Sequence, residues 1–410
     1  MKILVVGSGG REHALCWKFA QAPGNTIYAT PGNPGMAQVA SCFPASDPLK
    51  LAESLEVDLT VVGPEAPLAA GIVDRFRARR LAIFGPTQSA AKLESSKTFA
   101  KEFMQRWRIP TARFAAVDSA QRAIEELRNF SYPVVLKADG LAAGKGVIIA
   151  QNREEAERGI EQLMSDGGTL VIEEFLQGEE VSFIVLSDGN RVVALEATQD
   201  HKAVFDGDEG PNTGGMGAYC DGRILMREQS EAILRTVIDP VIEGMRAEGT
   251  PFTGFLYAGL MMTADGPRVL EFNARLGDPE TQPLMHRMRG DFVGALHGAA
   301  LGKLPEAPLE WKPEPSVCVV LAAAGYPGSP RRGDRITGWE QVNQGVVFHA
   351  GTELDLYGLT TNGGRVLGVT SSGPDLATAI GNTYIEVEKV RFEGMHYRKD
   401  IGRKGLIRWA

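Results

Sequence analysis

Residues 137–149 read Lys-Ala-Asp-Gly-Leu-Ala-Ala-Gly-Lys-Gly-Val-Ile-Ile, a glycine-rich loop between two apolar runs. The runs at 134–137 and 147–150 have the length and composition of strands. Glycines let backbone N–H groups approach a ligand closely. Lys137 and Lys145 add two ammonium groups, so the loop suits a polyphosphate. It is not a Walker A loop, because Gly146 follows Lys145 and a strand follows where a helix is needed. Taken alone, the stretch also fits a hairpin with solvated lysines.

The segments around this loop predict a small α+β unit. Strands are expected at 112–116 and 170–173, and helices at 119–129 and 153–164. Upstream, a long helix pattern runs over 89–106 and ends in a linker at 108–111. Downstream, strands are expected at 181–186 and 192–197, and a hairpin joins 256–263 to 268–273 through Ala264-Asp265-Gly266.

The first ~90 residues predict an open parallel sheet. The apolar runs at 3–6, 59–62 and 81–84 each end in a glycine turn, as strands buried on both faces do in βαβ units. Such sheets bind ligands at the carboxyl ends of their strands. Residues 7–13, 63–68 and 85–87 are therefore expected along one edge.

The first of these turns reads Gly7-Ser-Gly9-Gly10-Arg11-Glu12-His13 and is a poor dinucleotide fingerprint. Glu12 replaces the third glycine, and no acidic residue ends the second strand. A phosphate on the N-terminus of the following helix remains natural, and the adjacent Arg11 favours a single sugar phosphate. Gly63-Pro64-Glu65-Ala-Pro-Leu68 would form another wall of that pocket, or an ordinary Pro-capped helix start.

Two acidic segments suggest nucleotide and metal binding. In Glu271-Phe-Asn273-Ala-Arg275, residues two apart share a strand face. Glu271 and Asn273 are hard oxygen ligands suited to Mg²⁺, and Arg275 suits charge on a transferring phosphoryl group. In 171–182, an apolar strand runs into acidic residues: the backbone of 174–176 could pair with adenine, and Glu180, or its neighbour Glu179, could hold the ribose. Solvated polar strand ends are the alternative for both segments.

The segment Asp200-His201-Lys202, followed by a glycine-rich loop at 210–219, suggests a small-anion site. So polar a loop is expected to offer many unpaired N–H groups that could clamp an amino-acid carboxylate. A lone His201 would more often be structural, but beside Lys202 and this loop structural and functional roles are about equally favoured.

Bulk properties exclude several classes of protein. The 410 residues are too many for one core, and the net charge of −8 without a basic run argues against nucleic acid. The four cysteines lack metal-binding spacing and fit a reducing cytoplasm. No apolar run reaches the ~18–20 residues needed to span a bilayer. A proline-rich linker at 306–315 precedes a strand-rich tail.

Together these segments resemble the glycinamide ribonucleotide synthetases, a family of the ATP-grasp superfamily. The similarity runs nearly end to end and in the family's order. The matching segments are GSGGREHAL (7–15), GPEAPL (63–68), IFGPT (83–87), KADGLAAGKGV (137–147), VIEEFL (171–176), GEEVSF (178–183), QDHK (199–202), GPNTGGMGAY (210–219), GFLYAGLM (254–261), EFNARLGDPETQP (271–283) and HYRKDIG (396–402).

The resemblance implies a multidomain α/β and α+β chain: an N-terminal αβ domain at 1–90, an ATP-grasp domain at 91–315 with a lid at about 112–182, and a strand-rich domain at 316–410. It implies ligation of glycine to 5-phosphoribosylamine with ATP, through a glycyl phosphate, in cytoplasmic de novo purine synthesis. We expect a monomer that acts on small-molecule substrates with Mg²⁺ or Mn²⁺. We expect no nucleic-acid partner and no membrane association.

The resemblance also assigns residues by motif. Catalytic roles fall to Arg275 and Lys145. The ATP site would use Lys97, Lys137, Gly144, Lys145, Gly146, Glu173, Glu174, Phe175, Leu176 and Glu180, and the metal site Glu271 and Asn273. Phosphoribosylamine would contact Gly9, Gly10, Arg11, Glu12, His13, Gly63, Pro64 and Glu65. Glycine would contact Pro211, Asn212, Thr213, Gly214, Gly215, Met216, Arg275 and Asp278.

The chain departs from the family pattern in a short 165–169 segment and in Ala274, where a cysteine is common. Alternatives are another ATP-grasp carboxylate–amine ligase acting on a phosphorylated amine, a biotin-dependent carboxylase subunit, a D-alanine ligase, a dinucleotide-dependent oxidoreductase and a non-catalytic nucleotide sensor. The segments GREHAL and GPEAPL argue against the carboxylase and the D-alanine ligase. The broken dinucleotide fingerprint argues against the oxidoreductase. The retained lysines and acidic residues argue against the sensor.

Overall fold

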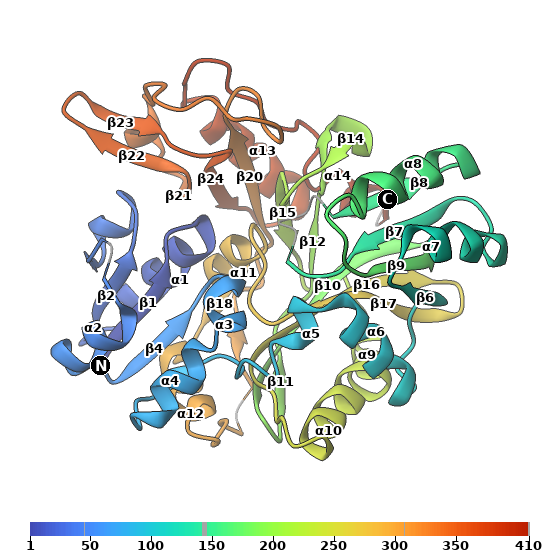
Figure 1. Ribbon diagram of the computed structural model, residues 1–410. Helices are drawn as coiled ribbons and strands as arrows, with labels where there is room; N and C mark the ends of the chain where they lie inside the picture. Colours follow the sequence, from blue (N-terminus) through green and yellow to red (C-terminus); the bar gives the residue numbers. More distant parts are fainter. Residues whose placement is uncertain (45, 142–145, 307, 409–410) are drawn as a thin grey trace.

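The computed structural model describes residues 1–44, 46–141, 146–306 and 308–408. The predicted site residues Gly144 and Lys145 lie outside this described part. Figure 1 shows the N-terminal unit and the C-terminal strands side by side, with the lid on the opposite side of the molecule and a long sheet connecting them. No helix in the described part of the chain is long and apolar enough to cross a membrane.

The N-terminal unit is the predicted open parallel sheet, with strand order β3-β2-β1-β4-β5. Its central strands are almost entirely buried, as their continuous apolar runs require. Because β1, β4 and β5 are parallel neighbours, the turns that follow them meet at one edge, as predicted. The elements are β1 Lys2–Gly7, α1 Gly10–Ala20, β2 Thr26–Pro31, the 3₁₀ helix Met36–Gln38, β3 Ser41–Cys42, α2 Pro48–Leu55, β4 Leu59–Val62, α3 Glu65–Ala69, α4 Ile72–Ala78 and β5 Ile83–Phe84.

The single helix predicted over 89–106 is wrong. The structure has α5 Lys92–Ser95 and α6 Lys97–Arg106, separated by Ser96 in an extended conformation (φ −138°, ψ 111°). The Ser96 hydroxyl accepts a hydrogen bond from Phe99 N (3.1 Å) and so caps α6. A serine that caps one helix interrupts the preceding one, a competition that hydrophobic periodicity does not reveal.

The lid is the predicted small α+β unit. Its antiparallel sheet has the order β6-β9-β7-β8, and the glycine-rich loop connects β7 to β8. Ser119 and Asn152 cap its helices, and Ala156 and Ile160 pack into its own apolar core. The elements are β6 Phe114–Val117, α7 Ala120–Glu126, the 3₁₀ helix Leu127–Asn129, β7 Val134–Ala138, β8 Val147–Ala150, α8 Arg153–Leu163 and β9 Leu170–Glu174.

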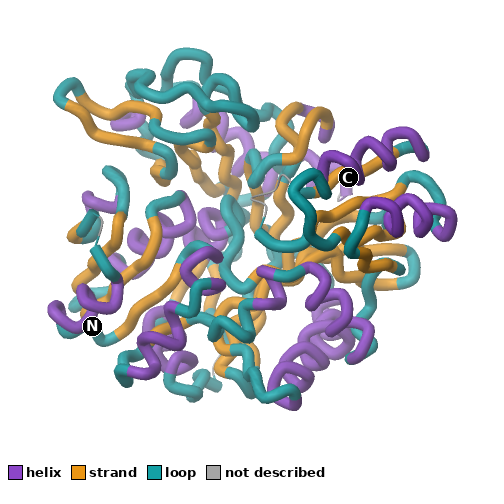
Figure 2. Tube along the Cα trace, viewed as in Figure 1, coloured by secondary structure: helices purple, strands orange, loops and turns teal. Residues whose placement is uncertain are grey.

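The central sheet runs without interruption into the C-terminal region, in the order β17-β16-β10-β12-β15-β20-β24-β21, with β11 beside β10. The tube in Figure 2 shows this band of strands crossing the molecule. The predicted hairpin forms β16 Thr253–Thr263 and β17 Gly266–Asn273. The other strands are β10 Glu179–Asp188, β11 Val192–Ala194, β12 Thr198–Asp200, β15 Gly217–Cys220, β20 Ser316–Ala322, β21 Gly345–His349 and β24 Arg365–Ser372.

The elements around the central sheet are helices and short hairpins. The described part of the tail predicted as strand-rich also contains two α-helices, of which α13 packs on β20 and β24. The hairpin strands are β13 Ala203–Phe205 with β14 Glu209–Asn212, β18 Met288–Arg289 with β19 Glu310–Trp311, and β22 Thr352–Asp355 with β23 Gly358–Thr361. The helices are α9 Arg227–Ile233, the π-helix Leu234–Ile238, α10 Asp239–Ala247, α11 Thr281–Arg287, α12 Phe292–Ala300, α13 Leu376–Val387 and α14 Arg403–Arg408, with short 3₁₀ turns at Asp206–Asp208 and Trp339–Gln341.

Candidate active site

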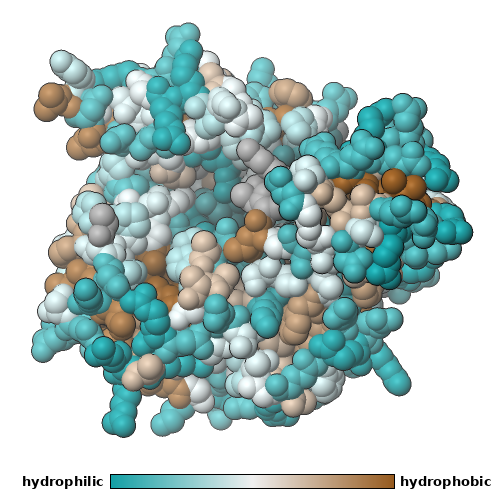
Figure 3. All heavy atoms as spheres, in the orientation of Figure 1, coloured by the Kyte–Doolittle hydropathy of each residue, from teal (hydrophilic) through white to brown (hydrophobic). Residues whose placement is uncertain are grey.

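A cleft of about 550 Å³ lies where the N-terminal unit, the lid, the central sheet and the C-terminal region meet. In the space-filling view a hydrophilic hollow opens between these parts (Figure 3). Lys137 of β7 and Glu271 of β17 both line the cleft, and Lys137 Nζ donates to Leu270 O across it (2.9 Å). The glycine-loop strand and the acidic strand, which are far apart in sequence, therefore face each other.

The structure brings most of the predicted site residues to this cleft. Its lining includes Arg11, Pro64, Glu65, Lys97, Lys137, Gly146, Glu173, Glu174, Phe175, Leu176, Glu180, Asn212, Thr213, Gly214, Glu271, Asn273, Arg275 and Asp278. The predicted site residues that do not line the cleft are Gly9, Gly10, Glu12, His13, Gly63, Pro211, Gly215 and Met216. The assigned ligand contacts of all these residues stay predictions.

Glu173 of the lid strand β9 is buried and pairs with two lysines. Its carboxylate lies 2.9 Å from Lys137 Nζ and 2.8 Å from Lys101 Nζ, and its residue exposure is 1%. Burial lowers the pKa of Lys101 to about 8, although Glu173 opposes this shift. The Glu173 side chain thus holds Lys137 in place, and Lys101 is a member of the site that the sequence patterns did not single out.

The strand end after Glu173 connects the lid to the base of the cleft. Glu174 Oε1 accepts from Arg113 N (2.8 Å) and from Arg268 Nη1 (3.3 Å). Phe175 follows with its side chain partly exposed at the cleft. On the same side, Lys97 Nζ donates to Gly140 O (2.7 Å) in the glycine-rich loop. An apolar side chain beside lysines matches a purine with its phosphates.

Glu271 and Asn273 line the base of the cleft, and no hydrogen bond or ion pair to either side chain occurs within the described residues. Burial would raise the pKa of Glu271, but Lys202, Lys137 and Lys97 outweigh it and lower that pKa. Glu271 is therefore an ionised carboxylate surrounded by cations. Within the described residues no group of three His, Cys, Asp or Glu side chains could hold a metal ion. A divalent ion would take two protein ligands here.

Arg275 joins the cleft to the N-terminal unit. Its Nη2 lies 2.9 Å from Glu94 Oε1 and its Nε 3.3 Å from Glu65 Oε2. Glu94 Oε2 also accepts from Ala274 N (2.7 Å). Burial opposes the charge, but Glu94 and Glu65 raise the pKa of Arg275. The guanidinium is permanently charged and fixed in orientation, and Glu94 is a second residue that the sequence patterns missed.

The first glycine turn is organised by Glu12. Its carboxylate accepts from Gly9 N (2.6 Å) and Arg11 Nε (2.6 Å), and a Cβ at Gly63 would overlap it. Arg11 lines the cleft and also donates to Leu276 O (2.8 Å). His13 instead lies buried against the C-terminal region, where its Nδ1 accepts from His349 N (2.8 Å). Burial lowers the pKa of His13 to about 3, so the ring is neutral.

The expectation that the loop near 210–217 offers many unpaired N–H groups is wrong for its central part. Thr213 N donates to Lys202 O (2.8 Å), and Met216 N to His201 O (2.8 Å). Gly215 N donates to Thr213 Oγ1 (2.9 Å), and Gly214 N to Tyr326 Oη (3.2 Å). These donors are satisfied inside the protein because the loop is packed between β12 and the C-terminal region, and no local pattern predicts that packing.

His201 lies in the interior of the protein, and this position indicates a structural role. The residue has no exposed surface, and burial lowers its pKa to about 3. Its neighbours on either side line the cleft instead. Lys202 Nζ lies 2.8 Å from Glu180 Oε2, and burial raises the pKa of Asp200 to about 7, against the opposing effect of Lys202. The alternation of a strand, which places i and i+2 on one face, would have predicted this division.

Other cleft residues were given no role by the sequence motifs. Tyr257 Oη donates to Glu280 Oε1 (2.7 Å) and shares a hydrogen bond with Ser182 Oγ (2.8 Å). Tyr326 and Arg365 reach the cleft from the C-terminal region. Only their position in the folded chain makes them part of the site.

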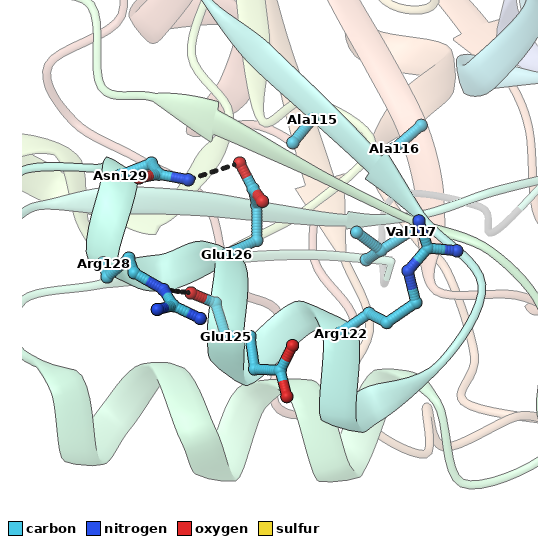
Figure 4. Close-up of a pocket in the computed structure, with 8 residues that line it drawn as sticks. All are labelled: Ala115, Ala116, Val117, Arg122, Glu125, Glu126, Arg128 and Asn129. Carbon is cyan, nitrogen blue, oxygen red and sulfur yellow. Dashed lines mark hydrogen bonds between the residues drawn. The ribbon is translucent and has the colours of Figure 1, made fainter.

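A second pocket of about 540 Å³ lies on the lid between β6 and α7 (Figure 4). Its polar side chains interact with their own helix: Asn129 Nδ2 donates to Glu126 Oε1 (2.9 Å), and Arg128 Nε to Glu125 O (2.7 Å). None of the predicted site residues lines it. Its volume is similar to that of the central cleft, so the lining, not the size, identifies the candidate active site.

Comparison with known proteins agrees with this geometry. Three family models of phosphoribosylglycinamide synthetase match: the N domain at residues 1–94, the ATP-grasp (A) domain at 95–281 and the C domain at 316–404. A phosphoribosylamine–glycine ligase of Ralstonia nicotianae is 51% identical over 422 residues, covering 100% of both chains. One from Neisseria meningitidis is 49% identical over 423 residues, also covering 100% of both.

Solved structures show the same fold. A phosphoribosylamine–glycine ligase of Thermotoga maritima has a TM-score of 0.87 at 37% identity, covering 98% of this chain and 100% of that one. A biotin carboxylase of Campylobacter jejuni has a TM-score of 0.73 at 16% identity, covering 98% of this chain and 94% of that one. At that identity the second likeness concerns the fold alone.

Proposed function

The chain belongs to the phosphoribosylglycinamide synthetase family, and from this membership we propose that it ligates glycine to 5-phosphoribosylamine. ATP is converted to ADP and phosphate, and the product, glycinamide ribonucleotide, belongs to purine biosynthesis. The observation that carries the proposal is one cleft lined by Lys137 of the lid, the acidic strand and the GREHAL and GPEAPL turns. A ligase acting on a different phosphorylated amine is the alternative.

ATP is proposed to lie between the lid and β17, as in the ATP-grasp family. Lys97, Lys137 and Gly146 would meet its phosphates, Glu174 to Leu176 the adenine, and Glu180 the ribose. Glu173 would act through Lys137, which it pairs with directly. Gly144 and Lys145 complete this assignment from the sequence.

A divalent metal ion, Mg²⁺ or Mn²⁺, is proposed to be held by Glu271 and Asn273. The two residues fit such an ion because both offer oxygen donors, the Glu271 pKa is lowered, and neither side chain is engaged elsewhere in the described protein. The bound ion would neutralise charge on the phosphate oxygens and bind them in a fixed geometry. The cations around Glu271 would likewise neutralise charge on the phosphate oxygens.

The reaction is proposed to pass through glycyl phosphate. A glycine carboxylate is a poor electrophile, and transfer of the γ-phosphoryl group to its oxygen supplies a phosphate leaving group. The amine of phosphoribosylamine, bound near Arg11, Pro64 and Glu65, then attacks the carbonyl carbon. Arg275 would hold the reacting oxygens, and the lid would keep water from the acyl phosphate. The protein's contribution is positioning and charge neutralisation, so no side-chain nucleophile is required.

A coupled ADP-release assay tests this function. Sustained ADP release is expected only when glycine and phosphoribosylamine are both present. Trapping with hydroxylamine should convert an acyl phosphate to glycine hydroxamate when ATP and glycine are supplied without the amine. Brisk turnover with another carboxylate and none with glycine would contradict the proposal. We also propose a monomer acting in the cytoplasm, and sedimentation analysis tests the oligomeric state.

A further inference from the structure

Arg365 brings the C-terminal region into the cleft. It is the first residue of β24, a strand of the same continuous sheet that contains β15 and β20. Its side chain is 23% exposed and lines the cleft beside the segment Asn212–Gly214. Neither the motifs nor the family assignment gave this residue a role.

One nitrogen of the Arg365 guanidinium holds the neighbouring backbone. Nη1 donates to Gly214 O (2.6 Å), Gly215 O (3.4 Å) and Asp278 O. Nη2 makes only an ion contact with Asp278 Oδ2 at 3.5 Å, and within the described residues Nε donates to no acceptor. The Nε–Nη2 edge is therefore available to a ligand, and this edge of arginine matches a carboxylate with two parallel hydrogen bonds.

The surroundings leave few other donors for an anion at this end of the cleft. The N–H groups of residues 213–216 are bonded within the protein. Most other cations that line the cleft have carboxylate partners at 3.3 Å or less: Lys137 pairs with Glu173, Lys202 with Glu180, Arg275 with Glu94 and Glu65, and Arg11 with Glu12. Lys97 has no carboxylate partner in the described protein, but its Nζ donates to Gly140 O in the lid loop (2.7 Å). Beside the segment Asn212–Gly214, the looser contact of Arg365 with Asp278 makes its guanidinium the available charge.

We propose that Arg365 is a substrate-binding residue whose Nε–Nη2 edge receives the carboxylate of the amino acid. Asp278 lies beside it and offers a carboxylate to the ammonium group, so the pair matches a zwitterion. The inference rests on the proposed function, because it assumes that an amino acid enters this cleft. It gives the C-terminal region a direct part in substrate affinity.

Steady-state kinetics of two variants test the proposal. Arg365→Lys keeps the positive charge but loses the paired Nε and Nη2 donors. Arg365→Gln loses both the charge and the paired donors. A charge-assisted hydrogen bond to a carboxylate contributes about 1.5–3 kcal/mol, so the KM for glycine should rise roughly 10- to 100-fold. The KM values for ATP and phosphoribosylamine and the kcat should stay within about threefold, because only binding of one substrate is weakened. Arg391→Gln is the matched control: Arg391 is exposed, and its Nη1 donates to the adjacent Val390 O.

Hydrogen exchange of residues 212–217 separates substrate binding from a purely structural role. A residue that only supports the loop would give faster exchange there and raise all three KM values together, which would overturn the proposal. An unchanged glycine KM in both variants would also overturn it. If the wild-type chain failed to turn over with glycine and phosphoribosylamine, the proposed function itself would be contradicted, a result distinct from either of these.

Discussion

Glu271 is a half-buried carboxylate without a direct partner in the described protein, although Lys97, Lys137, Lys202 and Arg275 all act on its pKa. Removing a charge from water is costly unless it is compensated. The surrounding cations supply that compensation at a distance and leave the carboxylate oxygens accessible at the cleft. Such an arrangement suits a residue that must bind a ligand rather than stabilise the fold.

Glu271→Gln is expected to lower kcat by about 100-fold or more, because loss of one preorganised charge at a reacting phosphate typically has that effect. The fold should be intact, as judged by circular dichroism and the thermal midpoint. Measurement of ADP release over a range of Mg²⁺ concentrations checks the prediction. Glu353→Gln, an exposed site on β22, is the matched control, and equal activity of both variants would place the metal elsewhere.

At the scale of elements, the lid is joined to the body of the protein through Glu173 of β9. This carboxylate lies between Lys137 of the neighbouring strand and Lys101 of α6. Thr111 adds a second connection, since its Oγ1 donates to Val269 O of β17. The base of the lid is therefore anchored by buried polar contacts.

Glu173→Gln should destabilise the protein by about 3 kcal/mol, because it leaves two lysines buried without a counter-charge. Urea denaturation followed by circular dichroism measures this loss. Glu174→Gln is the matched control: Glu174 is partly exposed and its ion pair with Arg268 is 3.3 Å long, so a change of about 1 kcal/mol or less is expected. Equal denaturation midpoints for the two variants would show that the buried ion pairs do not hold the lid.

For the whole molecule, buried histidines mark the places where distant regions pack together. His13 of α1 meets His349 of β21, and Asn33 Nδ2 bridges Ser8 O and His349 O (2.8 and 2.9 Å). Burial lowers the pKa of His13 and His201 to about 3, and of His286 and His349 to about 4. Neutral histidine rings thus pack at the contact between the N-terminal unit and the C-terminal sheet.

These pKa values predict that stability falls as the pH drops below about 6.5. Between pH 6.5 and about 4 these four histidines are protonated in the unfolded chain but stay neutral in the folded one. Each ring therefore lowers the free energy of unfolding by up to about 1.4 kcal/mol for each pH unit that the pH falls. Asp200 opposes the trend: its pKa is raised to about 7, so it favours the folded state as the pH falls below 7. Burial also raises the pKa of Glu94, Glu196 and Asp239, which act in the same sense as Asp200. The net loss of stability is therefore smaller than the four rings alone would cause.

Urea denaturation from pH 5 to 7 measures this loss, in a range above the ordinary carboxyl pKa values of about 4. His201→Asn should reduce the slope by up to about 1.4 kcal/mol per pH unit, whatever its effect on stability at neutral pH. If the free energy of unfolding changed with pH equally in the variant and the wild type, His201 would not be held neutral in the folded protein.

Local sequence was enough to predict the parallel N-terminal sheet, the lid strands around the glycine-rich loop, and the β16–β17 hairpin. Each depends on the spacing of apolar residues and on turn residues within about ten positions. The single helix over 89–106 failed at Ser96, where capping competes with periodicity. The motifs also identified Lys137, Glu271 and Arg275 as cleft residues, because each lies in or just after a recognisable strand.

Tertiary structure alone decided which groups in the site remain free to bind. The Thr213–Met216 amides are bonded to Lys202, Tyr326 and His201, while Arg365, 87 residues beyond Asp278, keeps an open edge. Sequence by itself determined the elements and the chemical groups they carry, since these follow from backbone preferences and near neighbours. Which donors are satisfied, and which charges face one another, depends on contacts between distant segments that exist only after the chain has packed.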